Sequence, residues 1–407
     1  MQTIVFIGSN KSGTSREALI TSTEMGYFTV LLTDRRVFIE QRAEFSEVHR
    51  MEFVDTLTDK EKIYSILTDL EQHSKQIRAV ISFIDPFVSY AAQISKELGL
   101  VQLSVDALAK MEEKTYFREQ LKLLPVSPFH FVLQMIQPID KYVEKYKDYL
   151  PLILKSPVSN GSKDVLLAKT NYELKEALIY FKKKFPKTTV LMEEYLIGPQ
   201  YLIEVMVIKG QIFLIAIIEQ EISYGERFII TGYIYPAKLE TIEDQKLQSA
   251  VASIVKQLGL INGTCHLEMK LVKGGWKLIE VNPRMSGGAM NRIIKEGTGI
   301  NLVKETLKLF LDEEPILEKT LMKHVYAKFI TVNSSGRLIK VTGKNRAATY
   351  EGVKEVFVKP RKGAILTKPY SLGDRYAYVI AAANSAEKAK SIAVEAANEI
   401  KFYLEPL

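Results

Sequence analysis

Four polar side chains along two neighbouring apolar segments have the types needed to hold a metal ion and phosphates. Glu280, Asn282 and Arg284 alternate along the second segment, and Glu268 lies in the first. Residues two apart on a β-strand share a face, so the first three side chains point the same way. A turn at Gly274-Gly275 would fold the segments into a hairpin and bring Glu268 beside them. Two carboxylates and an amide beside a guanidinium suit Mg²⁺ bound to the phosphates of a nucleotide.

A plain hairpin with one solvated face would also carry alternating polar residues. Pro283 interrupts the second segment, however, and Ser286-Gly287-Gly288 follows at once. A plain hairpin needs neither feature, so we favour a functional site.

A second candidate feature is a lysine followed by a loop of small residues. Lys155 ends an apolar segment, and Ser159, Gly161 and Ser162 follow it. A lysine at a strand end is commonly a surface residue. Small residues, however, let backbone amides approach phosphate oxygens. The loop 156–163 is therefore predicted to close over a β- or γ-phosphate.

Two further features are ambiguous when taken alone. Another apolar segment is followed by the run Glu193-Glu194-Tyr195-Leu196. Backbone groups of this run could pair with the edge of an adenine ring, and Leu196 could pack on its face. The same run could be a strand end with two solvated acids. Lys114 lies within a charged helix predicted over 111–124, where it could be an ordinary surface charge.

Composition excludes several classes of protein. The chain has 407 residues, a formal net charge of +7 and one cysteine, so an intrachain disulfide and a cysteine-based zinc site are excluded. The basic run 182–184 has no interleaved aromatic residues, which favours a solvated helix end over a nucleic-acid patch. No apolar stretch is long enough to span a bilayer, and residues 1–7 lack a basic leader, so we expect no membrane partner and a cytoplasmic location.

The chain divides into three regions. Residues 1–105 alternate strand and helix patterns, which predicts a parallel α/β sheet, although the turn 8–14 lacks both the P-loop and the dinucleotide fingerprint. Residues 106–195 form a compact α+β unit that carries the small-residue loop. Residues 196–407 are rich in strands, and the chain is predicted to end in a helix over 386–402.

The order of these features resembles the ATP-grasp superfamily. Lys114, Lys155 with its loop, the run 193–196, Glu268 and the segment 280–284 follow one another as in that family. The resemblance implies α/β and α+β structure, with a Rossmann-like N-terminal domain, a small lid subdomain and a C-terminal antiparallel-sheet lobe. The chain is most similar to the bacterial L-amino acid ligases, carboxylate–amine ligases that join two amino acids.

The resemblance also implies roles for individual residues. Lys114 and Lys155 would bind the α- and β-phosphates of ATP, the loop 156–163 would cover them, and the run 193–196 would hold adenine. Glu204 would contact the ribose. The metal ligands would be Glu268, Glu280 and Asn282, which in the family hold two Mg²⁺ ions, with Mn²⁺ as a substitute. Arg284 would stabilise charge on the transferred phosphoryl group.

The implied reaction converts a carboxylate, expected to be that of an L-amino acid, into an acylphosphate. The amine of a second amino acid then attacks, releasing phosphate, with ADP as the other product. The alternative is an ATP-grasp enzyme that uses bicarbonate or formate, as a carboxylase or purine-pathway ligase does. An oxidoreductase would need the missing fingerprint, and a non-catalytic scaffold would not need a metal site. The family also leads us to expect a homodimer.

Substrate residues are the least specified part of the prediction. Glu219 or Glu221 could accept an ammonium group or a basic side chain. Asp85 could face the cleft from the first region. An anion anchor could come from Arg284, Arg292, Asn291 or the amides of Gly287 and Gly288. Two positions depart from the family pattern: Gln200 stands where many relatives have an acid, and Tyr233 where the dipeptide-forming group often has a histidine.

Overall fold

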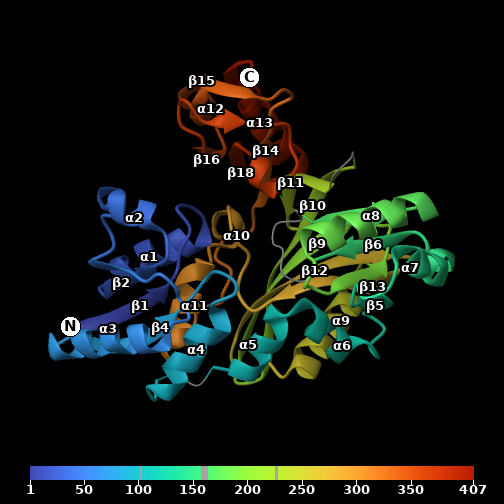
Figure 1. The fold of residues 1–407 in the computed structure, drawn as a ribbon. Coiled ribbons are helices and arrows are strands. Elements are labelled where there is room, and N and C mark those ends of the chain that lie inside the picture. Colours follow the sequence, from blue (N-terminus) through green and yellow to red (C-terminus); the bar gives the residue numbers. More distant parts are fainter. Residues whose placement is uncertain (101–102, 157–163, 225–227) are drawn as a thin grey trace.

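The computed structural model describes residues 1–100, 103–156, 164–224 and 228–407. The first region is a parallel sheet of order β3-β2-β1-β4 flanked by helices, as the alternating pattern predicted (Figure 1). Its central strands β1 and β2 are almost fully buried because helices cover both faces of the sheet, whereas the edge strand β3 is only partly buried. The elements are β1 (Gln2–Ile7), α1 (Thr14–Glu24), β2 (Phe28–Thr33), α2 (Arg36–Glu40), β3 (Arg50–Phe53), α3 (Lys60–Gln72), β4 (Gln76–Ile81) and α4 (Val88–Glu97).

The central region is a four-stranded antiparallel sheet of order β5-β8-β6-β7 with its own apolar core. Helix α8 (Asn171–Lys184) of this region begins with a capping box, in which the Thr170 hydroxyl and the Glu173 carboxylate satisfy each other's backbone amides. The elements are α5 (Val105–Glu112), α6 (Lys114–Leu121), β5 (His130–Leu133), α7 (Ile139–Tyr146), β6 (Leu152–Lys155), β7 (Val165–Ala168), α8 (Asn171–Lys184) and β8 (Val190–Glu194).

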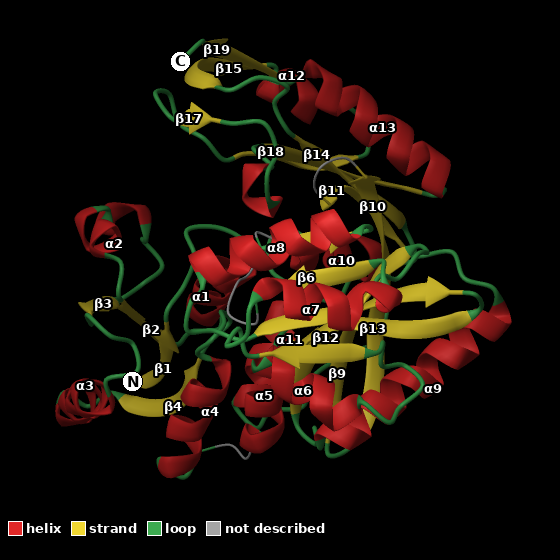
Figure 2. Ribbon diagram, turned by 45° about the vertical axis from the view of Figure 1, so that its right-hand side comes forward, coloured by secondary structure: helices red, strands yellow, loops and turns green. Residues whose placement is uncertain are grey.

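An eight-stranded sheet of order β13-β12-β9-β10-β11-β14-β18-β16 joins the middle of the chain to its C-terminal section. Helices α5, α6 and α9 lie against the β13 end of this sheet (Figure 2). The elements are β9 (Gln200–Ile208), β10 (Gln211–Tyr224), β11 (Phe228–Tyr235), α9 (Thr241–Leu258), β12 (Gly263–Val272), β13 (Gly275–Asn282), α10 (Met290–Thr298), α11 (Leu302–Phe310), β14 (His324–Ile330), β16 (Val353–Val358) and β18 (Ala377–Ala383).

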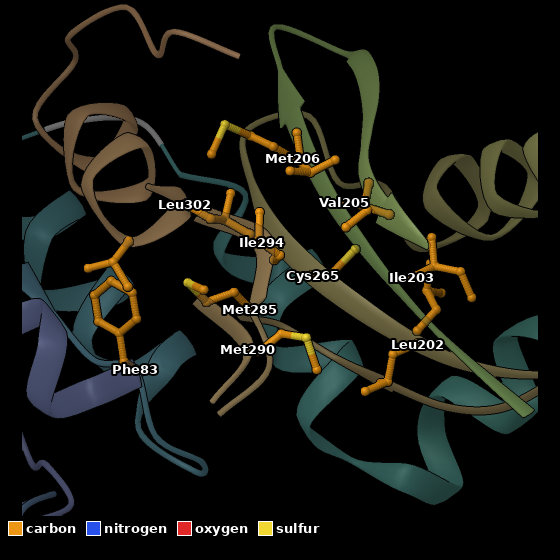
Figure 3. Packing of buried hydrophobic residues seen from close by; sticks show 14 of the residues in the cluster. Phe83, Leu202, Ile203, Val205, Met206, Cys265, Met285, Met290, Ile294 and Leu302 are labelled. Carbon is orange, nitrogen blue, oxygen red and sulfur yellow. The ribbon is translucent and has the colours of Figure 1, made fainter. Parts of the chain in front are cut away.

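The main hydrophobic core runs from the first region into the large sheet. Cys265 on β12 is fully buried there, with Val205 and Met206 of β9 on one side and Met285 and Ile294 on the other (Figure 3). Burial raises the pKa of the Cys265 thiol, which keeps it protonated. In this environment Cys265 serves as a small buried residue, because a thiol kept protonated is a poor nucleophile.

The C-terminal section ends differently from the prediction. Helix α13 (Ala386–Glu399) stops before 402, and the chain continues as β19 (Lys401–Glu405). This strand pairs with β15 (Gly336–Thr342), which also pairs with β17 (Ile365–Leu366), and the short helix α12 (Lys344–Ala348) follows β15. The prediction failed because Phe402 and Leu404 alternate with polar residues at the strand period and pack onto a separate small core.

No helix in the described ranges combines the length and apolar character needed to cross a bilayer.

The connection between β8 and β9 contains a backbone position that only glycine can occupy. Gly198 has a φ of +155°, and a Cβ there would lie 2.0 Å from the carbonyl oxygen of Leu271 on β12. The Leu271 amide donates to the carbonyl of Pro199 over 3.1 Å, so the strand cannot move away.

Gly198→Ala is expected to lower the free energy of unfolding by more than about 2 kcal/mol, because a backbone clash adds to conformational strain. Gly210→Ala is the matched control, since Gly210 has a φ of +81° with nothing within 4 Å of the added Cβ. It should cost only about 1 kcal/mol. Equal losses in urea unfolding of the two variants would contradict the importance of the close approach.

Candidate active site

The predicted hairpin forms, and it places the metal-ligand candidates opposite one another. In the β12–β13 register Glu268 pairs with Glu280, and His266 pairs with Asn282. The position of the turn differs by one residue from the prediction. Lys273 and Gly274, with φ of 47° and 75°, are the two turn residues, and Gly275 already begins β13. Two residues with positive φ match the twist of the flanking strands.

The two facing carboxylates differ in their electrostatics. Burial and the neighbouring Glu280 raise the pKa of Glu268 to about 7. Burial acts on Glu280 in the same direction, but the Lys114 and Lys155 ammonium groups outweigh it and lower the pKa of Glu280. Lys114 Nζ lies 3.2 Å from Glu280 Oε1. A divalent cation between the carboxylates would relieve the repulsion that keeps Glu268 partly protonated.

Lys114 reaches the hairpin because the predicted helix over 111–124 is in fact two helices. Glu113 is extended, with φ −104° and ψ 110°, so α5 ends before it and α6 begins at Lys114. The Lys114 side chain is buried instead of lying on a solvated helix surface. Of the two readings of Lys114, burial against Glu280 favours the one in a site.

Lys155 is held at the pocket by an ion-pair network that the sequence did not suggest. Its Nζ lies 2.6 Å from Glu193 Oε2, and Arg118 Nε donates to Glu193 Oε1 over 2.6 Å. Arg118 is fully buried and also donates to the carbonyls of Leu278 and Ile279 on β13, at 2.8 and 2.6 Å. Burial would raise the pKa of Glu193, but the two cations lower it, so this carboxylate stays ionised. Burial lowers the pKa of Lys155 although Glu193 acts in the opposite direction.

The segment expected to hold adenine is fixed by a buried lysine. Lys270 Nζ on β12 donates to the carbonyl of Leu196 over 3.0 Å and lies 5.9 Å from the ring centre of Tyr195. The side chain of Glu193 is used within the ion-pair network, so an adenine contact from that residue would come from its backbone.

These groups converge on one pocket of about 1080 Å³, part of it open to solvent. Its charged and polar side chains come from the six elements α6, β6, β8, β9, β12 and β13 and from adjoining loops, and apolar side chains line the rest. The lining includes Lys114, Lys155, Glu193, Glu194, Tyr195, Leu196, Gln200, Ile222, Phe228, Ile230, Glu268, Lys270, Leu278, Glu280 and Leu372. Ser159, Gly161 and Ser162 of the predicted lid lie outside the described residues.

Asn282 is oriented by a histidine on the paired strand. His266 Nδ1 lies 2.9 Å from the carbonyl oxygen of Arg284, and His266 Nε2 lies 3.2 Å from Asn282 Nδ2. A carbonyl can only accept, so Nδ1 donates and Nε2 accepts from the amide nitrogen. Burial lowers the pKa of His266 to about 4, which keeps this neutral tautomer. The amide oxygen of Asn282 is thereby left free of the histidine and able to face a cation.

Arg284 joins the hairpin to the first region through an ion pair with Asp85. Its Nε donates to Asp85 Oδ2 over 3.0 Å, and its Nη2 contacts the same oxygen. Asp85 Oδ1 is buried without a hydrogen-bond partner in the described part of the chain. The structure therefore brings Asp85 next to the arginine predicted to be catalytic.

The loop after Arg284 packs against the first region. The Thr14 hydroxyl donates to the carbonyl of Ser286 over 2.8 Å, and a Cβ on Gly13 would lie 3.0 Å from the backbone of Gly288. Gly288 is thus placed where two backbones meet closely, whereas a Cβ on Gly287 would have nothing within 4 Å.

Asn291 and Glu204 are used by the protein itself. Asn291 Nδ2 donates to Glu17 Oε2 and its Oδ1 accepts from Val303, so it ties α10 to α1 and α11. Glu204 is fully buried, does not line the pocket, and accepts from the Ser286 amide at 3.1 and 3.3 Å. This geometry supports positioning roles for both residues and gives no support to an anion anchor at Asn291 or a ribose contact at Glu204.

Glu219 and Glu221 lie on the face of β10 that is turned away from the pocket. Glu221 accepts from the Tyr326 hydroxyl and pairs with Lys390 of α13. Ile222, which alternates with them, lines the pocket instead. The predicted ammonium site at these acids therefore has no support, because the strand alternation places them on the opposite side of the sheet.

Several functional candidates escaped the sequence interpretation, although weak signals were present. Arg118 is four residues after Lys114 and so shares its helix face. Lys270 and His266 are each two residues from Glu268 and share its strand face. No spacing rule relates Arg118 to Glu193, which is 75 residues away.

Protein-family models match three parts of the chain. Residues 22–100 match the ATP-grasp N-terminal domain, 149–292 the ATP-grasp domain, and 328–405 the L-amino acid ligase C-terminal domain 2. The chain has the ATP-grasp fold. The expected fold class is confirmed by these matches, and the C-terminal section matches the model of an L-amino acid ligase domain.

Similar proteins agree with the family. The chain is 29% identical over 265 residues to the uncharacterized protein y4rH of Sinorhizobium fredii, covering 63% of this chain and 54% of that protein. It is 24% identical over 282 residues to dapdiamide A synthase of Enterobacter agglomerans, covering 63% of this chain and 64% of that protein. The chain thus spans between half and two thirds of the length of these curated relatives.

Solved structures show the same fold. The L-amino acid ligase from Bacillus licheniformis superposes with a TM-score of 0.83 at 21% identity, covering 100% of this chain and 99% of that one. Phosphoribosylglycinamide synthetase from Anaerococcus prevotii superposes with a TM-score of 0.75 at 17% identity, covering 99% of both chains.

The buried carboxyl of Glu204 predicts a pH-dependent stability. Burial raises its pKa to about 7 from an ordinary 4.5, so between these values the unfolded chain loses a proton that the folded chain keeps. Stability therefore falls as pH rises through this window, by up to about 3 kcal/mol. Glu204→Gln resembles the protonated form and should remove most of that fall. We expect the difference in unfolding free energy between the variant and the parent to shift by about 2 kcal/mol in favour of the variant from pH 5 to pH 8. A pH-independent difference would contradict this role for Glu204.

Proposed function

We propose that this protein is an ATP-dependent carbon–nitrogen ligase that activates the carboxylate of an L-amino acid as an acylphosphate. The amine of a second amino acid then displaces phosphate, and ADP and phosphate are released. The observation that carries the proposal is the meeting of Lys114, Lys155, Glu268 and Glu280 in one pocket. Two cations and two carboxylates there match a triphosphate with its metal ion.

The nucleotide part of the proposal rests on charge and shape. Lys114 and Lys155 supply positive charge for phosphate oxygens. The Glu193 carboxylate, which Arg118 holds by its own ion pair, keeps Lys155 in place. The hinge at Tyr195 and Leu196 offers backbone groups and an apolar surface for adenine. The groups that would position the triphosphate therefore come from both the central region and the large sheet.

The metal part of the proposal fits the donor set. Glu268, Glu280 and the oriented oxygen of Asn282 are hard oxygen ligands, as Mg²⁺ and Mn²⁺ prefer. No group of three or more histidine, cysteine or acidic side chains that could hold a metal occurs in the described residues. Two carboxylates and one amide leave positions for phosphate oxygens and water, which is how Mg²⁺ is commonly bound. One or two such ions would neutralise phosphate charge during transfer.

The protein's own residues account for the remaining steps. A carboxylate is a poor electrophile, so its oxygen first attacks the γ-phosphorus of ATP, and the bond between that phosphorus and the bridging oxygen breaks to leave ADP. Lys114 and Lys155 hold the phosphates in line for this transfer. The amine nitrogen then attacks the acyl carbon, the C–O bond to phosphate breaks, and the nitrogen loses a proton to solvent. Arg284, which pairs with Asp85 of the first region, would stabilise the negative charge that develops.

The choice of amino acids as substrates is supported by the C-terminal section. Residues 328–405 match a domain model described for L-amino acid ligases, and this section continues the sheet that carries the pocket. A homodimer and a cytoplasmic location stay predictions.

Phosphate release tests the activity directly. ATP and Mg²⁺ with pairs of the twenty amino acids should give release for some pairs, and bicarbonate or formate alone should give none. Arg284→Ala should lower release with the active pair by about 100-fold or more, because a donor to developing charge is lost.

Asp85→Asn is the matched control, since it breaks the same ion pair but keeps the guanidinium. It should retain most of the activity. Equal losses in both variants would show that Arg284 acts only by holding the first region. Release with bicarbonate and not with amino acids would overturn the substrate assignment.

His266→Phe tests the orientation of Asn282. The variant removes the acceptor that holds the amide, so Mn²⁺ should bind about 10- to 100-fold more weakly in the presence of ADP, as measured by electron paramagnetic resonance. His73→Phe, at an exposed histidine on the first region, is the control and should leave the affinity unchanged. Unchanged Mn²⁺ affinity in His266→Phe would contradict the proposed role.

A further inference from the structure

A buried glutamine on the pocket side of the large sheet has no partner for either end of its amide. Gln220 on β10 is buried, and its Oε1 and Nε2 accept and donate no hydrogen bond within the described ranges. It lies directly opposite Gln200 in the β9–β10 register, and Gln200 lines the nucleotide pocket. Ile222, two residues along the same strand, also lines it. Gln220 therefore faces the side of the sheet on which the nucleotide would bind.

A guanidinium from the C-terminal section lies beside the same part of the sheet. Arg375 comes just before β18, and its carbon Cζ lies 4.0 Å from the ring centre of Phe329 and 5.9 Å from that of Tyr233. Its Nε donates to the carbonyl of Leu372 over 3.2 Å. The stacking and the hydrogen bond fix the plane of the guanidinium, while its buried Nη1 has no partner in the part of the chain that is described.

Tyr233 and Leu372 connect Arg375 to Gln220 and to the pocket. Tyr233 is directly opposite Gln220 in the β10–β11 register, so their side chains share a face. Leu372, whose carbonyl holds Arg375, lines the nucleotide pocket. The unpartnered amide of Gln220 thus lies next to Gln200, and the oriented guanidinium of Arg375 next to Leu372, both of which line the pocket.

The acid next to Arg375 in sequence is already used. Asp374 Oδ2 accepts from the amides of Tyr370 and Ser371 and caps the short turn there. Arg375 therefore has a buried N–H without an acid to pair with it among the described residues. A buried donor of a charged group is costly when unpaired, and an anionic ligand would satisfy it.

We propose that Arg375 and Gln220 bind the carboxylate of the amino acid that supplies the amine, which makes them specificity residues for the second substrate. The proposal rests on the ligase function proposed above. A planar guanidinium stacked on an aromatic ring is suited to a carboxylate, and the Gln220 amide can donate to the same group. The first amino acid has its carboxylate converted into the acylphosphate, so only the second keeps a free carboxylate for this site.

The same chemistry would also recognise a phosphate group of ATP, and the experiment separates these sources. The acceptor amino acid found in the phosphate-release screen is offered as its free acid and as its C-terminal amide, which lacks the negative charge. The parent protein should use the free acid with a KM at least 10-fold below that of the amide. Arg375→Met keeps the apolar stem on Phe329 and should raise the KM for the free acid by about 10- to 100-fold. The KM for ATP should stay within about 2-fold, and the preference over the amide should be lost.

Two further variants make the test specific. Arg337→Met removes an exposed arginine of the same section and should change neither KM. Gln220→Leu should raise the KM for the free acid with little effect on ATP. A rise confined to the KM for ATP would assign the site to phosphate, and unchanged constants in Arg375→Met would overturn any ligand role.

Failure of the ligase proposal gives a different result from failure of this inference. If the ligase function is wrong, the parent protein releases no phosphate with any amino acid pair. If only the inference is wrong, the parent protein is active and Arg375→Met behaves like it. Should Arg375→Met fail to fold, Arg375→Lys and Gln220→Leu still decide the question through the discrimination between free acid and amide.

Discussion

The buried ion-pair network of Lys155, Glu193 and Arg118 is the interaction on which the site depends. Charges removed from water are stable only when they are paired and hydrogen-bonded, and here one carboxylate serves two cations. Arg118 also donates to two carbonyls of β13, so the network joins α6, the central sheet and the large sheet at one point. Lys155 is thereby presented to the pocket that Glu280 also lines.

The site is composite because the large sheet has two distinct faces and extends into the C-terminal section. One face carries Glu268, Glu280 and Gln200 along the pocket, and the other carries Glu221 against α13. Strands β14, β16 and β18 of the C-terminal section belong to the same sheet, so residues more than 100 positions apart lie side by side. The first region is attached through Arg284 with Asp85 and through Thr14 with Ser286, next to the metal-ligand candidates.

Local patterns predicted the parts of the site that lie within one element or one hairpin. The period-two alternation of Glu280, Asn282 and Arg284, with a turn nearby, was enough to bring Glu268 beside them. The direct pairing of Glu268 with Glu280 depends on a turn one residue earlier than predicted. The same kind of reasoning failed for Glu219 and Glu221, because alternation shows that two residues share a face but not which face meets the ligand. The prediction of one helix over 111–124 failed for another reason. Composition did not reveal that the backbone of Glu113 is extended and that Lys114 turns inward.

The amino-acid sequence by itself determined the order of the elements, the parallel first region, the hairpin and the types of side chain available for binding phosphate and metal. These follow from periodicity and turn chemistry, which act over a few residues. Tertiary structure alone decided that Arg118 neutralises Glu193, that Lys270 holds Leu196, and that Arg375 lies over Phe329. Such contacts join residues far apart in the chain, and their geometry is set by the packing of whole sheets, which no local spacing encodes.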